Sequence, residues 1–200
     1  MLRRMSAPIK DESEDSFSVP PRTPEFTIEK LSTNLYRLSV RGCFTPGWLA
    51  RLSAGLSDHK VSILCGGGRQ IYGSYWEAGF EIKMAAFTDD PRKLDFRSFV
   101  EARTSVRYDE SFELREFSIE QPEDPHQAVW VVVKGADKIG FLRNILKVFA
   151  FYSLFPSEIE IETIGANACD RFLLHSVGGT APSANALQGV RELLADFCHC

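Results

Sequence analysis

The sequence has no uninterrupted apolar run of the roughly 18 residues that a membrane span needs. An acidic run follows Arg3 and Arg4 where a secretory leader would be apolar. The five cysteines have neither a disulfide framework spacing nor a zinc-ligand spacing, and the adjacent Cys198 and Cys200 cannot close a tetrahedral site with the histidine between them. We therefore expect a cytoplasmic protein with reduced thiols, no metal and no membrane association.

Basic residues are also few relative to acidic ones. The formal net charge is -4 and the isoelectric point is near 5.6, and the only basic cluster is Arg3-Arg4. Binding nucleic acid requires Lys and Arg to neutralise phosphates, so nucleic acid is not the partner that we expect. The four histidines lie outside any nucleophile motif such as Gly-x-Ser-x-Gly. We expect no catalytic residues, no cofactor and no enzymatic activity.

What the chain does contain is enough apolar material for a core, with 44% hydrophobic residues. Residues 1–24 are an exception, because they are rich in Pro, Ser and acidic residues and have no apolar period. We expect this segment to be a disordered tail. Beyond this segment, the sequence contains an internal repeat.

The internal repeat begins with a short motif, Phe26-Thr27-Ile28-Glu29, which has a near copy in Phe117-Ser118-Ile119-Glu120. After each copy an apolar segment leads into a glycine, four residues and a second glycine. These glycines are each 93 positions apart: Gly42 and Gly135, Gly47 and Gly140. Matches in the same order predict two copies of one module, over residues 25–115 and 116–200.

Each copy shows the same series of local patterns. Apolar residues recur three or four positions apart after Gly47 and Gly140, which predicts helices there. Alternating segments predict strands, the glycines predict turns between them, and a second helix ends each copy. The predicted strands are 61–64, 75–84, 159–164 and 171–177, the turns contain Gly66-Gly67-Gly68, Gly73 and residues 165–167, and the final helices are 95–104 and 183–197. Asp95 and Ser183 are the expected N-caps.

These patterns predict an α+β protein made of two ferredoxin-like β-α-β-β-α-β modules. The chain stops after a helix, so we expect the Phe-x-Ile-Glu strand at the front of each copy to occupy the sheet edge that a strand after the last helix would otherwise fill. Each module is then circularly permuted, or strand-exchanged. Paired modules of this kind can join their sheets edge to edge or pack their helices side by side, and we expect a homodimer.

The segment Val133-Lys134-Gly135-Ala136-Asp137-Lys138-Ile139-Gly140-Phe141-Leu142 resembles the strand-end motif of ACT domains, the small regulatory modules of amino-acid metabolism. Phe44 to Leu52 is similar to the Pro-Gly-Leu-Leu form in the ACT pairs of the PII uridylyltransferase and of glycine-cleavage repressor-type proteins. Asp170-Arg171-Phe172 resembles the start of the family's third strand. The resemblance covers residues 25–198 and implies allosteric regulation by a bound amino acid or through a partner protein.

The candidate ligand-binding residues follow from these two loops. Glycine permits a positive φ at the turn, and the helix that begins there offers unpaired N–H groups and a positive dipole, which suit a carboxylate. Asp137 is the candidate acceptor for an ammonium group, which makes the second loop the better expected site. The candidates are Thr45, Pro46, Gly47 and Trp48 in the first loop, and Gly135, Ala136, Asp137, Lys138, Ile139, Gly140, Phe141 and Leu142 in the second.

Two other functions remain open at this point. A ferredoxin-like sheet can bind RNA when central strands expose aromatic residues, and Tyr36, Tyr75, Trp76 and Trp130 are the available ones. The acidic balance argues against this function. An enzyme of a type that no motif reveals is the second alternative, and His175 and Asp137 are the residues whose mutation would test it.

Overall fold

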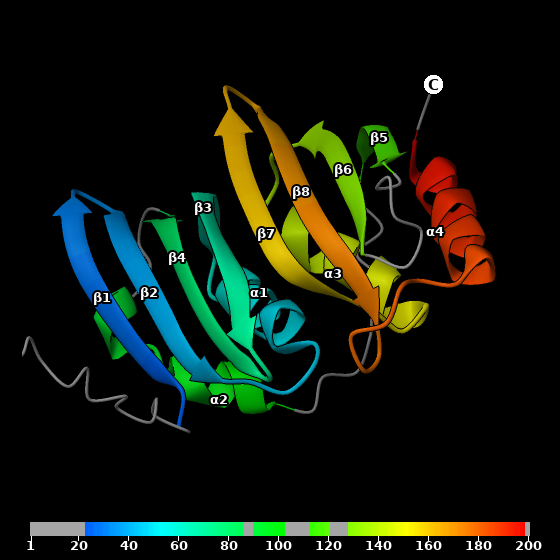
Figure 1. Ribbon diagram of the computed structural model, residues 1–200. Coiled ribbons are helices and arrows are strands. Elements are labelled where there is room, and N and C mark those ends of the chain that lie inside the picture. Colours follow the sequence, from blue (N-terminus) through cyan, green and yellow to red (C-terminus); the bar gives the residue numbers. More distant parts are fainter. Residues whose placement is uncertain (1–22, 86–89, 103–112, 121–127, 199–200) are drawn as a thin grey trace, which may run out of the picture.

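A computed structural model describes residues 23–85, 90–102, 113–120 and 128–198. The predicted tail, residues 1–24, lies outside this part of the chain except for its last two residues. The α+β class is confirmed, because the described residues form one antiparallel sheet of eight strands and four α-helices (Figure 1). None of these helices is both long and apolar enough to cross a membrane.

The two halves of the chain have the same order of elements. The first contains β1 (Glu25–Ser32), β2 (Leu35–Cys43), α1 (Trp48–Asp58), β3 (Val61–Tyr72), β4 (Tyr75–Met84), a 3-10 turn (Pro91–Lys93) and α2 (Phe96–Glu101). The second contains β5 (Leu114–Glu120), β6 (Val129–Ala136), α3 (Phe141–Phe151), β7 (Leu154–Ile164), β8 (Asn167–Ser176) and α4 (Ala184–Phe197). The predicted boundary between residues 115 and 116 falls within β5 and stays a prediction.

The strand order of the sheet is β1-β2-β4-β3-β7-β8-β6-β5. Within each module the first strand of the copy is therefore the outer one, beside the strand that leads into the Gly-x-x-x-x-Gly loop. This is the edge position predicted for the Phe-x-Ile-Glu strand. Phe26 pairs with Val40, and Phe117 pairs with Val133 at the equivalent place.

The modules join through β3 and β7, which pair antiparallel from Cys65 opposite Glu162 to Arg69 opposite Glu158. The triple glycine lies in this junction, inside β3, so the prediction that it forms a turn is wrong; the turn comes later, at Gly73. Close packing explains the glycines. A Cβ on Gly67 would lie 2.9 Å from the carbonyl oxygen of Ile159 in the other module, and one on Gly66 would collide with the Gly79 carbonyl.

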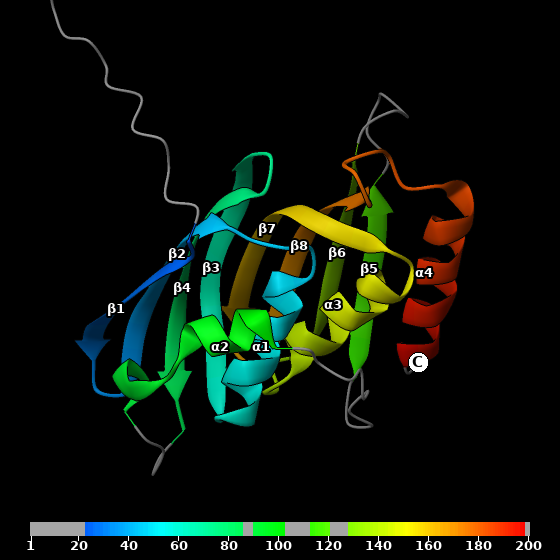
Figure 2. The same cartoon turned by 90° about the horizontal axis from the view of Figure 1, so that it is seen from below.

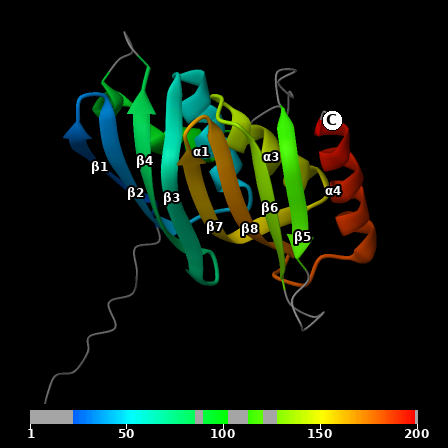
Figure 3. The ribbon, with the colours of Figure 1, turned by 90° about the horizontal axis from the view of Figure 1, so that it is seen from above.

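Helices α1, α2 and α3 cover one face of the sheet, and α4 packs against α3 and β5 at its far end (Figures 2 and 3). Alternate strand residues point into this layer and form a continuous core across both modules. Among the largest fully buried side chains are Phe80, Phe149 and Phe172. Helices α1 and α3 also contact each other, so both expected kinds of contact, edge to edge and helix to helix, occur between the modules of one chain.

Local sequence sets the helix ends as expected in most places. Gly47 and Gly140 are the N-cap residues of α1 and α3, with φ angles of 80° and 94° that favour glycine. Asp95 and Ser183 are confirmed as N-caps, since their side chains accept hydrogen bonds from the N–H groups of Ser98 and Ala186. Helix α2 is shorter than the predicted 95–104.

Candidate functional site

The two Gly-x-x-x-x-Gly loops have the same backbone geometry. The N–H of Phe44 donates to the Ser74 carbonyl, and the N–H of Asp137 donates to the Ala166 carbonyl, both at 2.9 Å. Each helix then begins with a hydrogen-bonded turn. The N–H of Trp48 donates to the Thr45 carbonyl, and the N–H of Phe141 donates to the Lys138 carbonyl. Neither α1 nor α3 has a side-chain N-cap bond, so the first amide groups of both helices take no cap from a side chain.

Each loop also faces the other module, and the two surroundings are equivalent by position. The first loop lies against α3 and β7, with Leu146, Ala150 and Leu154 beside it. The second lies against α1 and β3, with Ser53, Ser57 and Val61 beside it. Each of these three pairs has the 93-residue offset of the repeat. The module interface therefore contains two pseudo-symmetric candidate sites.

The first site is a cavity of about 520 Å³, which is within the range of small-molecule sites. All four candidates of the first loop, Thr45, Pro46, Gly47 and Trp48, line it. The opposite wall comes from the second module, mainly through Phe155, Ser157 and His175. Its other lining residues are Phe44, Leu49, Ala50, Gln70, Gly73, Ser74, Trp76, Leu146, Ala150, Leu154, Pro156, Ser176, Val177, Gly178 and Gly179.

The second site is almost filled. The space next to the second loop is about 30 Å³, about the size of one water molecule. Six of the candidates border this space: Asp137, Lys138, Ile139, Gly140, Phe141 and Leu142. Gly135 and Ala136 lie outside the lining of either site, and a Cβ on Gly135 would collide with the Phe141 ring. The space thus lies at the first loop, although the sequence favoured the second.

Equivalent positions of the two sites carry side chains of different size. Arg143 lines the second site at the position where the first site has Ala50. The Arg143 guanidinium extends to α1 and forms an ion pair with Asp58, with an N–O distance of 3.0 Å. Its side chain therefore spans the two modules and occupies space that Ala50 leaves open.

A second pair of equivalent residues, Arg51 and Asn144, differs in how it holds the loop. Arg51 donates hydrogen bonds to the Pro46 carbonyl at 3.1 Å, to the Thr45 hydroxyl at 2.6 Å and to the Val100 carbonyl at 2.5 Å. It thereby ties the first loop to α2, and partial burial lowers the pKa of Arg51. Asn144 is 3% exposed, and its Oδ1 has no hydrogen-bond partner among the described residues.

Two carboxyl groups lie at the second site. Asp170 is 1% exposed, and burial raises its pKa to about 8, although an N–H donor from Glu162 acts in the opposite direction. Burial also raises the pKa of Asp137, against the effect of the Thr163 side chain. The Asp137 charge raises the Asp170 pKa further. Asp170 Oδ1 has no hydrogen-bond partner in the described part of the chain, and the first module has Ala78 at this sheet position.

The described lining of the first site contains no Asp, Glu, Lys or Arg, and its one histidine is His175. Its pKa is lowered by burial, partly offset by the backbone of Gly179, so the ring is neutral at pH 7. The buried Nδ1 has no hydrogen-bond partner among the described residues. The ring is therefore a neutral, partly buried group in the wall of the cavity.

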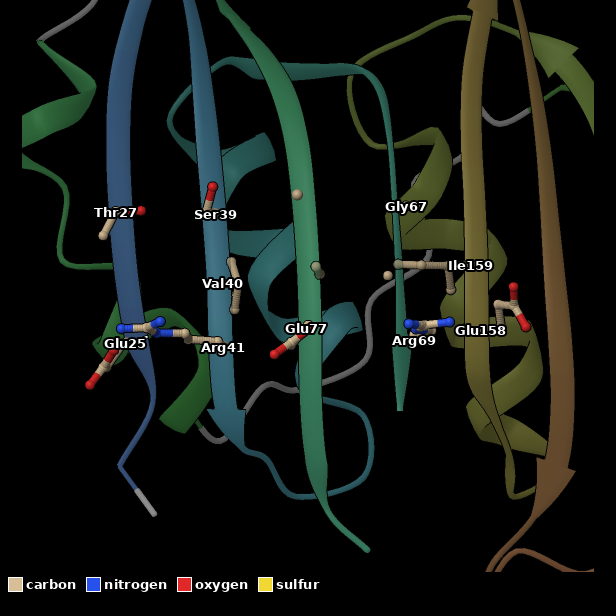
Figure 4. Close-up of a pocket in the computed structure, with 13 residues that line it drawn as sticks. Glu25, Thr27, Ser39, Val40, Arg41, Gly67, Arg69, Glu77, Glu158 and Ile159 are labelled. Atoms are coloured by element: carbon tan, nitrogen blue, oxygen red, sulfur yellow. Dashed lines mark hydrogen bonds and ion pairs between the residues drawn. The ribbon is translucent and has the colours of Figure 1, made fainter. Parts of the chain in front are cut away.

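A wider hollow, of about 750 Å³, lies on the sheet face away from the helices (Figure 4). Gly67 and Gly79 are neighbours at its floor, and a row of cross-strand neighbours with alternating charge borders it. The row runs from Glu25 through Arg41, Glu77 and Arg69 to Glu158. Opposite charges on neighbouring strands stabilise a sheet, which is sufficient reason for this row.

Three of the four aromatic residues of the RNA-binding alternative are buried, and the fourth, Trp130, is partly buried beneath an arginine. Tyr36, Tyr75 and Trp76 are each 5–6% exposed. The guanidinium of Arg171 lies over the Trp130 ring, 4.1 Å from its centre. Stacking of bases on exposed rings is how such sheets bind RNA, so the described aromatic residues give this alternative no support.

Sequence reasoning missed the second wall of the first site. Phe155, Ser157 and His175 are close to Thr45 and Trp48 only because β3 and β7 pair across the modules. No local signal marks them, but the repeat offset combined with edge-to-edge pairing would have placed β7 opposite the first loop. Asp170 was singled out only for the family resemblance, and its burial follows from its inward position on β8.

Comparisons with known proteins leave the function open. No protein-family model matches the chain, and no curated protein matches it. The structure is similar to aspartate kinase from Synechocystis, with a TM-score of 0.48 and 15% sequence identity. The match covers 82% of this chain and 27% of that one, so the chain spans only about a quarter of that protein's length.

Proposed function

We propose that this chain is a non-catalytic regulatory protein whose two ACT-like modules bind a small metabolite, an amino acid or a molecule of similar size, in the cavity between them. The observation that carries this proposal is the cavity of about 520 Å³ between the first Gly-x-x-x-x-Gly loop and the second module. Ligand sites are concave and mostly apolar, with few polar groups. The repeated β-β-α-β-β-α order and the permuted strand position agree with the ACT resemblance.

The position of the cavity suggests how binding acts as a signal. Its walls come from α1 and the first loop on one side, and from α3, β7 and β8 on the other. A ligand that contacts both modules more closely in one arrangement than in another shifts the balance between those arrangements. The shift would be carried by the same α1–α3 and β3–β7 contacts that join the modules.

The response would reach a partner protein or a second copy of the chain. Strands β1 and β5 are the two edges of the sheet, and edge strands have backbone groups available for pairing. We propose a cytoplasmic homodimer that uses such an edge. Light scattering of the purified protein should give twice the chain mass, and a monomer mass at all concentrations would contradict the dimer.

The binding proposal is tested by calorimetric titration of the full chain with the twenty amino acids and a set of small carboxylates. Ala150→Phe places a ring in the cavity, and Phe151→Trp is the matched control because Phe151 is the next residue of α3 and is 69% exposed. We expect at least one compound to bind the wild type and Phe151→Trp but not Ala150→Phe. Absence of binding by every compound, or binding unchanged by Ala150→Phe, would contradict this function.

A further inference from the structure

The lining of the first cavity is unusual for a site that holds a zwitterion. None of its described lining residues is Asp, Glu, Lys or Arg. An amino acid has an ammonium group, which loses its hydration when it enters an apolar cavity and needs an acceptor of comparable strength. The carboxyl groups of Asp137 and Asp170 lie at the other site.

The stacked rings of Phe44 and Trp48 and the neighbouring Trp76 ring do not replace a carboxylate. A cation can be held over the open face of an aromatic ring. The rings of Phe44 and Trp48 are stacked on each other, with centres 4.5 Å apart and planes at 28°. Trp76 meets Trp48 at 70° and 5.4 Å, and both tryptophans are at most 5% exposed. These ring faces pack against one another in the core.

The polar groups at the cavity are neutral. They include the uncapped amide groups at the start of α1 and the neutral ring of His175, whereas the Ser157 hydroxyl already donates to the Leu173 carbonyl at 3.3 Å. Such groups suit one polar or anionic end of a ligand. The rest of the wall, including Leu146, Ala150, Leu154 and Phe155, suits an apolar tail.

We propose that the ligand of this cavity is a small carboxylate with an apolar tail and no ammonium group, rather than an amino acid. This inference rests on the proposed function and narrows its ligand. An amino acid would lose the hydration of its ammonium group on entering and would gain no charged partner there. A site with this lining therefore rejects the amine-bearing member of a pair of ligands that share one tail.

The test uses sets of compounds that differ only at the α-carbon. Leucine is compared with 4-methyl-2-oxopentanoate and 4-methylpentanoate, and phenylalanine is compared with phenylpyruvate, by calorimetry on the full chain at pH 7.5. We expect at least one amine-free acid to bind about tenfold or more tightly than its amino acid, with binding lost in Ala150→Phe and kept in Phe151→Trp. Equal or tighter binding of the amino acids at this cavity overturns the inference and leaves the proposed function standing.

A variant that adds a negative charge tests whether the missing charged partner causes this preference. Gln70→Glu places a carboxylate at the rim of the cavity without changing the size of the side chain, and it also removes the hydrogen bond that the Gln70 amide donates to the Gly73 carbonyl. We expect the preference for the amine-free acid to fall about threefold or more, and an unchanged preference contradicts the charge argument. Failure of every compound to bind the wild type, amino acids included, contradicts the proposed function itself.

Discussion

The two Gly-x-x-x-x-Gly loops of this chain have one backbone geometry and two different surroundings. Both loops face the other module, and both have a helix that begins at a glycine with positive φ. The first borders about 520 Å³ of space with no acidic residue in its described lining, and the second borders about 30 Å³ with two carboxyl groups. The two modules therefore share the backbone of the loops, while the side chains around each loop differ and only the first site is open.

The largest expected effect comes from the buried Asp170, which has Ala78 as its counterpart. Its pKa is near 8 in the folded protein and near 4 in the unfolded chain, so the unfolded state loses this proton first. Stability should therefore fall as pH rises from about 4 to about 8 and then level off. Between pH 5 and pH 8 this one group contributes a loss of up to about 4 kcal/mol in the free energy of unfolding.

The variant Asp170→Asn removes this ionisation and keeps an acceptor for the Glu162 N–H. Urea unfolding at a series of pH values should show a shallower slope for the variant than for the wild type over the pH 5 to 8 range. Ala78→Ser is the control at the equivalent position of the first module, because it adds a small polar group that does not titrate in this range. Parallel slopes for wild type and Asp170→Asn would show that Asp170 does not carry the pH dependence.

The next effect concerns how each loop is held. Arg51→Met removes the bonds that join the first loop to Val100 in α2, and we expect a loss of about 2 kcal/mol. The equivalent change in the second module, Asn144→Leu, removes a buried amide whose oxygen has no partner among the described residues. It should be neutral or stabilising by about 1 kcal/mol. Urea unfolding of both variants at pH 6 measures the difference, and equal losses would mean that the loops are held alike.

Much of the frame could be predicted from the sequence, because it depends on local signals and on duplication. The repeat, the helices after Gly47 and Gly140, the caps at Asp95 and Ser183 and the edge position of the Phe-x-Ile-Glu strand all follow from spacing. The triple glycine was misread as a turn because glycine permits turns and close strand pairing alike. The close contacts of these glycines with Gly79 and Ala78 on β4 and with Ile159 of the other module separate these two roles.

The open and closed sites could not be ranked from the sequence, because space depends on contacts between modules. Asp137 favoured the second loop by its chemistry, but no local pattern shows that Arg143 extends to Asp58. The same is true of His175, which reaches the first site only through the strand pairing of β3 with β7. Residue type predicted candidate chemistry, and tertiary packing decided where a ligand has room.

The smallest expected effect tests whether residue 50 and its counterpart 143 set this difference in room. Ala50→Arg should introduce into the first site the arginine side chain that lines the second. The compound that binds the wild type most tightly should then bind about tenfold more weakly, because the new side chain occupies part of the cavity. Arg143→Ala is the matched control because residue 143 lies outside the first cavity; the change removes the ion pair with the largely exposed Asp58 and the side chain at the second site. Its affinity for the same compound should be unchanged. If both variants bind the compound like the wild type, the open space depends on the wall from β7 and β8 rather than on residue 50 of α1. The difference between the two sites would then lie in that wall.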